Sequence, residues 1–141
     1  MIVRAQQLKE ADQAIHPNLR NFWPFDPKYQ YPTDEELKEA VEYAKQHEFL
    51  RDYVNRGPVE DCDNAALYSS AIIHHWWARL GKTTPVSYGR TMGYKFRGMR
   101  GGHCLNQCRT ESGLYYIDFD AGGRIWKASK ENDAIFFSEY S

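Results

Sequence analysis

The chain has 141 residues, with 18 basic and 19 acidic side chains and a formal net charge of −1. This length fits a single domain with its own core, and the balanced charge gives no electrostatic basis for binding nucleic acid or an anionic membrane. No stretch approaches the roughly 20 apolar residues of a membrane span, and the N-terminus lacks the apolar core of a signal peptide. We therefore expect a cytoplasmic protein with neither membrane nor nucleic acid as a partner.

Residues 1–32 are expected to form an N-terminal arm. Positions 1–15 carry a weak helical periodicity, and positions 16–32 are rich in aromatic residues and in residues that precede proline, where helix is disfavoured. An extended segment laid across the domain explains both features. The same aromatic side chains could instead line the rim of a substrate cleft, and Trp23 is our candidate there.

Residues 33–80 are expected to be helical. The sequence Thr33-Asp34-Glu35-Glu36 is a capping box that predicts a helix to about residue 49. A second helix is predicted from Cys62 to about Leu80, because Gly81 is the expected stop signal. This second helix is apolar on more than one face, so we expect it to be central and buried.

Residues 84–141 are expected to form an antiparallel sheet, which makes the whole chain one α+β domain. Residues 97–102 read as a flexible connection just before His103. The predicted strands are short, rich in aromatic and β-branched residues, and separated by glycine or polar turns. They cover residues 85–89, 91–96, 103–109, 114–120, 124–127 and 134–137.

Three cysteines cannot all pair within one chain. Cys104 and Cys108 lie on the same predicted strand, about 13 Å apart, which is too far for a disulfide. Reduced thiols are therefore expected. A zinc site built from these two thiols with Cys62 and His103 is disfavoured, since the sequence has no Cys-x-x-Cys and His103 and Cys104 face opposite sides of a strand. We expect no metal and no cofactor.

Cys62 occupies the first position of the second helix, with Asp61 as its N-cap. The positive end of a helix favours the thiolate and lowers the pKa of a thiol placed there. Asp61 and Asp63 oppose that effect through their negative charge. A reactive thiol at this position therefore needs a cationic partner, and a histidine from elsewhere in the chain is the obvious candidate.

The predicted strands 103–109 and 114–120 supply such a histidine together with a carboxylate. A two-residue turn between them places His103 opposite Asp120, with Asp118 diagonal on the same face, roughly 7–8 Å away at the backbone. A three-residue loop would turn both carboxylates away. The hairpin thus allows a His103–Asp118 hydrogen bond, with Asp120 as the rival.

A thiol, an imidazole and a carboxylate in this order suit nucleophilic acyl transfer. Cys62 would supply the attacking sulfur, and its backbone N–H would stabilise the oxyanion. His103 would take the thiol proton and return it to the leaving amine. Asp118 would orient the imidazole ring.

The residues 61–67, Asp-Cys-Asp-Asn-Ala-Ala-Leu, resemble the Asp-Cys-Asp-x-Ala segment of bacterial and phage transglutaminase-like cysteine peptidases, in the papain-like superfamily. Residues 103–118 are similar to that family's histidine strand, turn, aromatic strand and aspartate. The resemblance covers about residues 57–121. It implies a papain-like core, with the Cys-bearing helix packed on an antiparallel sheet, and a catalytic triad of Cys62, His103 and Asp118. It also makes a phage-associated location possible.

Two functions follow from these observations. The first is a thiol hydrolase or acyltransferase that acts on an amide in a peptide, isopeptide or cell-wall crosslink, with Tyr53 and Asn55 joining Trp23 as candidate substrate-binding residues. The second is a non-catalytic module on the same fold that binds a peptide or a glycan. The second is favoured by two departures from the family pattern, namely Cys104-Leu105 where Ala-Trp is usual and Phe119 where proline is usual.

Overall fold

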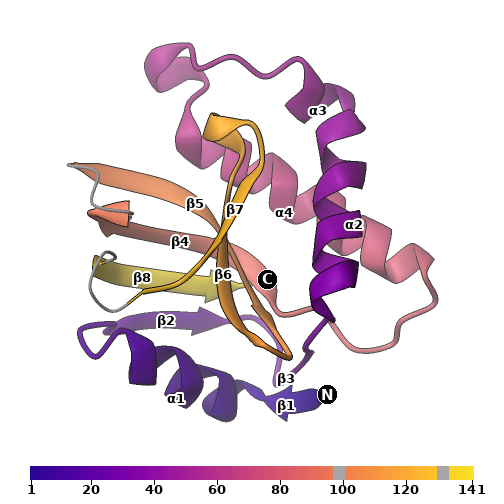
Figure 1. Cartoon of the computed structure of the whole chain (residues 1–141), viewed down its shortest axis with the longest axis vertical. Helices are drawn as coiled ribbons and strands as arrows, with labels where there is room; N and C mark the ends of the chain where they lie inside the picture. Colours follow the sequence, from indigo (N-terminus) through magenta and orange to yellow (C-terminus); the bar gives the residue numbers. More distant parts are fainter. Residues whose placement is uncertain (97–100, 130–133) are drawn as a thin grey trace.

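The computed structural model describes residues 1–96, 101–129 and 134–141 (Figure 1). Most of the expected connection at residues 97–102 lies outside these ranges. The helical elements are α1 (Ala5–Ile15), α2 (Asp34–Gln46), α3 (Glu48–Arg51), η1 (Gly57–Val59), α4 (Cys62–Arg79) and η3 (Phe119–Ala121). The strands are β1 (Ile2–Arg4), β2 (Asn21–Pro24), β3 (Lys28–Gln30), β4 (Tyr88–Tyr94), β5 (Gly102–Thr110), β6 (Gly113–Asp118), β7 (Arg124–Lys127) and β8 (Ala134–Tyr140).

Both long helices begin at the predicted capping residues. The Thr33 hydroxyl accepts the Glu36 backbone N–H at 3.0 Å, and the Glu36 carboxylate accepts the Thr33 N–H at 3.0 Å. Asp61 is the N-cap of α4, and its N–H donates to the Asn64 side chain at 3.0 Å. These bonds satisfy backbone donors that a helix start leaves free. The predicted start and extent of α4 are confirmed.

The main sheet has six strands in the order β2-β8-β4-β5-β6-β7, and β1 and β3 form a separate two-stranded sheet. Neighbouring strands of the main sheet are antiparallel except β2 and β8, which pair in parallel with Asn21 opposite Phe137. The expectation of an antiparallel sheet is therefore wrong at this edge. The physical reason is that β2 and β8 come from opposite ends of the chain, and local periodicity carries no information on such a pairing.

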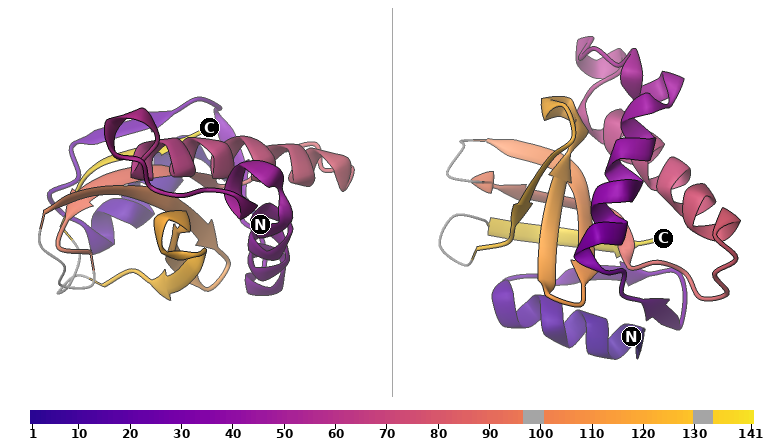
Figure 2. Two further views of the ribbon diagram at one scale, coloured as in Figure 1. Left: turned by 90° about the horizontal axis from the view of Figure 1, so that it is seen from above. Right: turned by 45° about the vertical axis from the view of Figure 1, so that its right-hand side comes forward.

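The β5–β6 hairpin has a two-residue turn, with Thr110 opposite Gly113, so of the two alternatives left open by the sequence the shorter turn is present. Side chains of β5 alternate between the two faces of the sheet. Asn106 donates to the Ala66 carbonyl of α4 at 2.9 Å, so α4 covers one face, as the left panel of Figure 2 shows. Arg109 bonds Asp12 of α1 at 2.8 Å on the other face. The sheet is thus buried from both sides.

Separate core clusters stabilise the two faces. The first joins α2 and α4 to the sheet and includes Ile73, Trp77 and Ile117. The second lies on the opposite face and includes Phe96 and Tyr116. Burial of these large side chains is the main stabilising contribution, at about 25 cal/mol per Å² of apolar surface. Among the described residues, no helix is both long enough and apolar enough to cross a bilayer.

Candidate functional site

Cys62 is half-buried at the first residue of α4, beside β5. Burial raises the pKa of its thiol, and the nearby carboxylates of Asp61, Asp120 and Asp63 raise this pKa further. The backbone of Cys104, which faces the Cys62 sulfur, lowers the pKa but does not offset the other effects. The net shift is upward. The structure therefore favours the neutral thiol, which differs from the low pKa that the helix start alone suggests.

His103 and Asp118 form the hydrogen bond that the hairpin register allows, with 2.8 Å between Nε2 and Oδ2. Their side chains are 19% and 6% exposed. This bond raises the pKa of His103, although burial of the ring acts in the opposite direction. The other carboxylate oxygen of Asp118 accepts the Asp120 N–H at 3.0 Å, so Asp118 is held from both sides. The catalytic roles of these residues stay predictions.

Asp120, the rival carboxylate, has different partners. The Tyr53 hydroxyl donates to its Oδ1 at 2.6 Å, and the Asn55 amide donates to the same atom at 3.2 Å. These bonds fasten the segment before η1 to the turn after β6. The structure thus brings Tyr53 and Asn55 to the edge of the Cys62 region. Trp23 lies on β2, 58% exposed, and no described contact joins it to that region.

Cys62 and His103 belong to contacting segments, the start of α4 and β5, but the thiol and the imidazole are not hydrogen-bonded. Cys62 contacts the backbone of Cys104, the residue after His103. The His103 ring packs against Phe96 of the second core cluster, with 6.3 Å between ring centroids. Among the described residues, no hydrogen bond links the Cys62 sulfur to the His103 ring. A nucleophile and its base need such a bond at the reactive stage.

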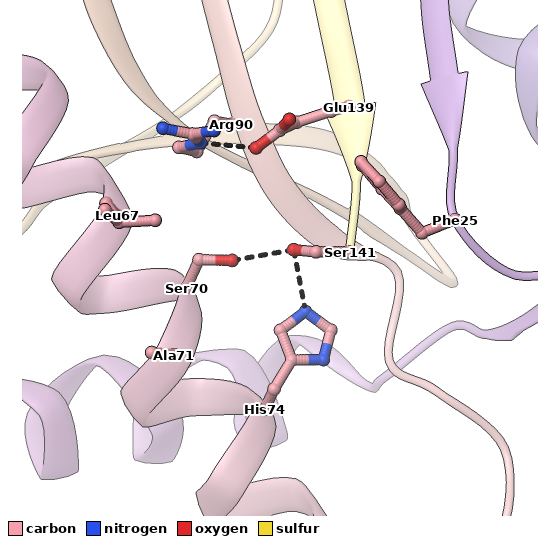
Figure 3. Close-up of a pocket in the computed structure, with 8 residues that line it drawn as sticks. All are labelled: Phe25, Leu67, Ser70, Ala71, His74, Arg90, Glu139 and Ser141. Carbon is pink, nitrogen blue, oxygen red and sulfur yellow. Dashed lines mark hydrogen bonds and ion pairs between the residues drawn. The ribbon is translucent and has the colours of Figure 1, made fainter.

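A pocket of about 530 Å³ opens between α4, β4 and β8, and its residues are shown in Figure 3. Arg90 of β4 forms an ion pair with Glu139 of β8 at one side of it. The Ser70 and Ser141 hydroxyls are 2.8 Å apart at the other side. The lining residues are Phe25, Leu67, Ser70, Ala71, His74, Arg90, Glu139 and Ser141.

His74 is held at the base of this pocket. Its Nε2 donates to the Tyr88 carbonyl at 2.9 Å and lies 3.5 Å from the Ser141 hydroxyl. Burial lowers the pKa of the His74 ring, so the ring is neutral near pH 7. The hydroxyls and this imidazole give the pocket hydrogen-bonding groups without a net charge.

Reasoning from the sequence missed this pocket. The pocket adjoins the predicted site through Arg90, which interacts electrostatically with Cys104 and Asp63. Leu67, Ser70, Ala71 and His74 belong to α4, and the remaining lining residues come from β4, from the end of the chain at β8 and from the segment after β2. They meet only because β2, β8 and β4 pair in this order. No local sequence signal could have found them together.

Sequence comparisons find no relatives. No known protein family matches the chain in a family search, and no curated protein matches it. Comparison with solved structures does find similar folds. One is the PSL1a-E64 complex, with a TM-score of 0.76 and 16% identity, covering 99% of this chain and 50% of the other.

A second similar structure is Polyporus squamosus lectin bound to the human-type influenza-binding epitope Neu5Aca2-6Galb1-4GlcNAc. Its TM-score is 0.76 and its identity 16%, and the match covers 99% of this chain and 49% of the lectin. The chain therefore spans about half the length of each of these proteins. At this identity the likeness shows the fold alone.

These findings correct the resemblance to transglutaminase-like cysteine peptidases, together with the papain-like core inferred from it. The physical reason lies in the motif itself. An aspartate before a helix and small residues in its first turns are what capping and close packing require of many helices, so Asp-Cys-Asp-x-Ala does not identify a family. The structure is a mixed sheet with helices on both faces, and it shares its fold with half of a lectin.

Proposed function

We propose that this chain is a glycan-binding module and that the pocket of Figure 3 is its binding site. The observation that carries the proposal is the fold shared with half of a lectin that was solved with a sialylated trisaccharide. The expected partner is accordingly a carbohydrate, in place of a peptide or glycopeptide substrate.

The chemistry of the pocket supports this ligand class. Sugars present C–H faces that pack on aromatic rings and hydroxyl edges that need hydrogen bonds. Phe25, 68% exposed at the rim, offers the ring. Arg90 and Glu139 offer planar charged groups, and two serine hydroxyls lie opposite. The volume lies within the range of about 300–1,000 Å³ that is usual for small-molecule sites.

The test is a glycan-array screen followed by calorimetry on Phe25→Ala. We expect Phe25→Ala to weaken binding of the best glycan by about tenfold, since the ring is exposed and its loss does not disturb the core. Trp23→Ala is the matched control, because Trp23 is an exposed aromatic two residues away but outside the pocket. The absence of any binding glycan, or equal losses for the two variants, would contradict the proposal.

A second function, thiol-dependent hydrolysis or acyl transfer on an amide, is favoured by one observation. The His103–Asp118 pair is formed, and His103 lies on β5, the strand that Cys62 contacts. In this reaction the Cys62 sulfur attacks the carbonyl carbon, His103 takes the thiol proton and gives it to the leaving amine, and water or another amine releases the acyl group. The ring must first move to reach the sulfur.

E64 is a suitable probe for this second function, because one of the similar structures contains it. Wild type, Cys62→Ala and His103→Ala are incubated with E64 and analysed by intact-protein and peptide mass spectrometry. Attachment at Cys62 that is lost in His103→Ala supports the thiol reaction. An inert Cys62 in a protein that still binds its glycan leaves the binding module as the function.

A further inference from the structure

A second pocket, of about 280 Å³, lies on the helical side of the molecule between α2, α3 and α4. Rings dominate its lining, while aliphatic side chains of α4 form the rest of it. The rings belong to Tyr43 and His47 at the end of α2, to Phe49 of α3, and to Tyr68 and His75 of α4. Neither function proposed above uses these side chains.

Several rings that line this pocket pack against neighbouring rings. Phe49 lies between His47 and Tyr68, at centroid distances of 4.8 and 5.4 Å. Tyr43 packs against Trp76 of α4, with 6.4 Å between ring centroids. Phe49 and Tyr43 are nevertheless 55% and 38% exposed, so much of their ring surface is free to contact a ligand.

The local field in this pocket favours positive charge. Tyr43 lies in the last turn of α2 and His47 is its C-cap, so the pocket is at the negative end of that helix dipole. The Tyr68 hydroxyl donates to Glu60 Oε2 at 2.8 Å, which places a carboxylate at the hydroxyl end of the ring and increases its electron density. The same bond raises the pKa of Tyr68.

The lining contains no lysine or arginine that would oppose a cation. The nearest candidate in α2, Lys45, is engaged with Glu42 at 3.0 Å. His47 Nδ1 accepts the Phe49 N–H at 3.2 Å, and a ring nitrogen that accepts a hydrogen bond carries no proton. His47 Nδ1 is therefore engaged within the chain and presents no N–H to a ligand.

We propose that this pocket binds an organic cation, of the quaternary or methylated ammonium class. Aromatic faces attract such cations electrostatically, and a weakly hydrated ammonium loses little on leaving water. A purely apolar ligand would fill the same volume but would gain nothing from Glu60 or from the end of α2. The site shares only α4 residues with the pocket of Figure 3, so it does not depend on the glycan proposal.

The test uses the full chain and a pair of probes that differ in charge. Choline is titrated at pH 8 and fixed ionic strength, and binding is followed by NMR shifts of the Phe49 and Tyr68 rings. Its neutral isostere, 3,3-dimethyl-1-butanol, is titrated in the same way. We expect choline to bind about tenfold more tightly than the isostere. Equal or tighter binding of the isostere, or no saturable shift with choline, overturns the proposal.

Two variants separate charge from shape. Glu60→Gln keeps an acceptor for the Tyr68 hydroxyl and removes the negative charge, so choline binding should weaken several-fold while isostere binding does not change. Phe49→Leu keeps an apolar side chain without the aromatic face, and choline binding should weaken about tenfold. Phe25→Ala, in the pocket of Figure 3, should leave the affinity for choline unchanged. Wild-type choline affinity in Glu60→Gln would overturn the proposal, even if Phe49→Leu fails to fold.

Discussion

Two surfaces along α4, the Cys62 region at its start and the pocket of Figure 3 beside its middle, differ in how their charges are balanced. Around Cys62, Asp61, Asp63 and Asp120 raise the pKa of the thiol. In the adjacent pocket, Arg90 is paired with Glu139, and the remaining polar groups are neutral.

This difference indicates which of the two surfaces can bind a ligand without a change of protonation. The pocket has matched groups in place, so a neutral sugar could bind without a change of protonation. The Cys62 region would have to ionise a thiol in a negative field and bring an imidazole to it before it could react. This contrast is why we place glycan binding before thiol chemistry.

The largest expected effect on stability comes from a glycine-to-alanine substitution beside the pocket, compared with the same type of substitution next to His103. In Gly89→Ala, beside the pocket, the new Cβ would lie 1.9 Å from the Glu139 carbonyl oxygen, so β4 and β8 must separate. We expect a loss of about 3 kcal/mol or more in the free energy of unfolding, measured by urea denaturation.

Gly102→Ala, next to His103, is the control for this change. Its Cβ would meet the Tyr94 ring at 3.5 Å, an ordinary contact, so unfolding should change by less than about 0.5 kcal/mol. Similar losses for the two variants would show that the rear of the pocket is no more tightly packed than the Cys62 region.

A smaller effect concerns the His103–Asp118 bond. The pKa of His103 is raised in the folded state, so the stability from this pair is fully present below the unfolded pKa of about 6.5 and is lost as the pH rises through the folded value. Asp118→Asn should therefore cost about 1 kcal/mol more at pH 5.5 than at pH 8.5.

NMR titration of the His103 ring checks the same point directly. We expect a pKa above 6.5 in the wild type and a value below 6.5 in Asp118→Asn, because burial then dominates. A His103 pKa that does not respond to Asp118→Asn would remove the main argument for the second function.

The smallest effect is on the reactivity of Cys62. Burial and three carboxylates raise the pKa of its thiol, so it should alkylate more slowly at pH 7 than a free thiol does. Asp120→Asn removes one of those charges and should speed iodoacetamide labelling about two- to threefold. Cys104, whose pKa burial raises to about 12, is the unreactive internal control. Fast labelling of Cys62 at pH 6 would favour the thiol reaction over glycan binding as the function of this chain.

Features that depend on neighbouring residues could be predicted from the sequence. The α4 start follows from the Asp61 cap, and the α2 start follows from Thr33 and Glu36. The His103–Asp118 bond follows from a two-residue turn between adjacent strands. In each case the partners lie within about 15 residues, where propensity and register are sufficient.

The Asp-Cys-Asp motif at the start of α4 is a weaker guide to this protein than the hydrogen-bond geometry of its caps and strands. The Asp-Cys-Asp start of α4 resembles that of a peptidase family, but the fold is shared with half of a lectin. Capping chemistry explains that start without any catalytic role. The pKa of Cys62 also depends on Asp120, which lies 58 positions later in the sequence.

By itself, the sequence determined the starts of α2 and α4 and their capping residues and allowed the β5–β6 register, because these depend on short-range hydrogen bonds and side-chain periodicity. The helix predicted to about residue 49 instead ends at Gln46, and α3 follows after His47. Only the tertiary structure decided that β2 pairs in parallel with β8, that Arg90 meets Glu139, and that rings from three helices surround one pocket. Those contacts join remote segments. Their free energy depends on how the sheet and helices pack together, which no local pattern records.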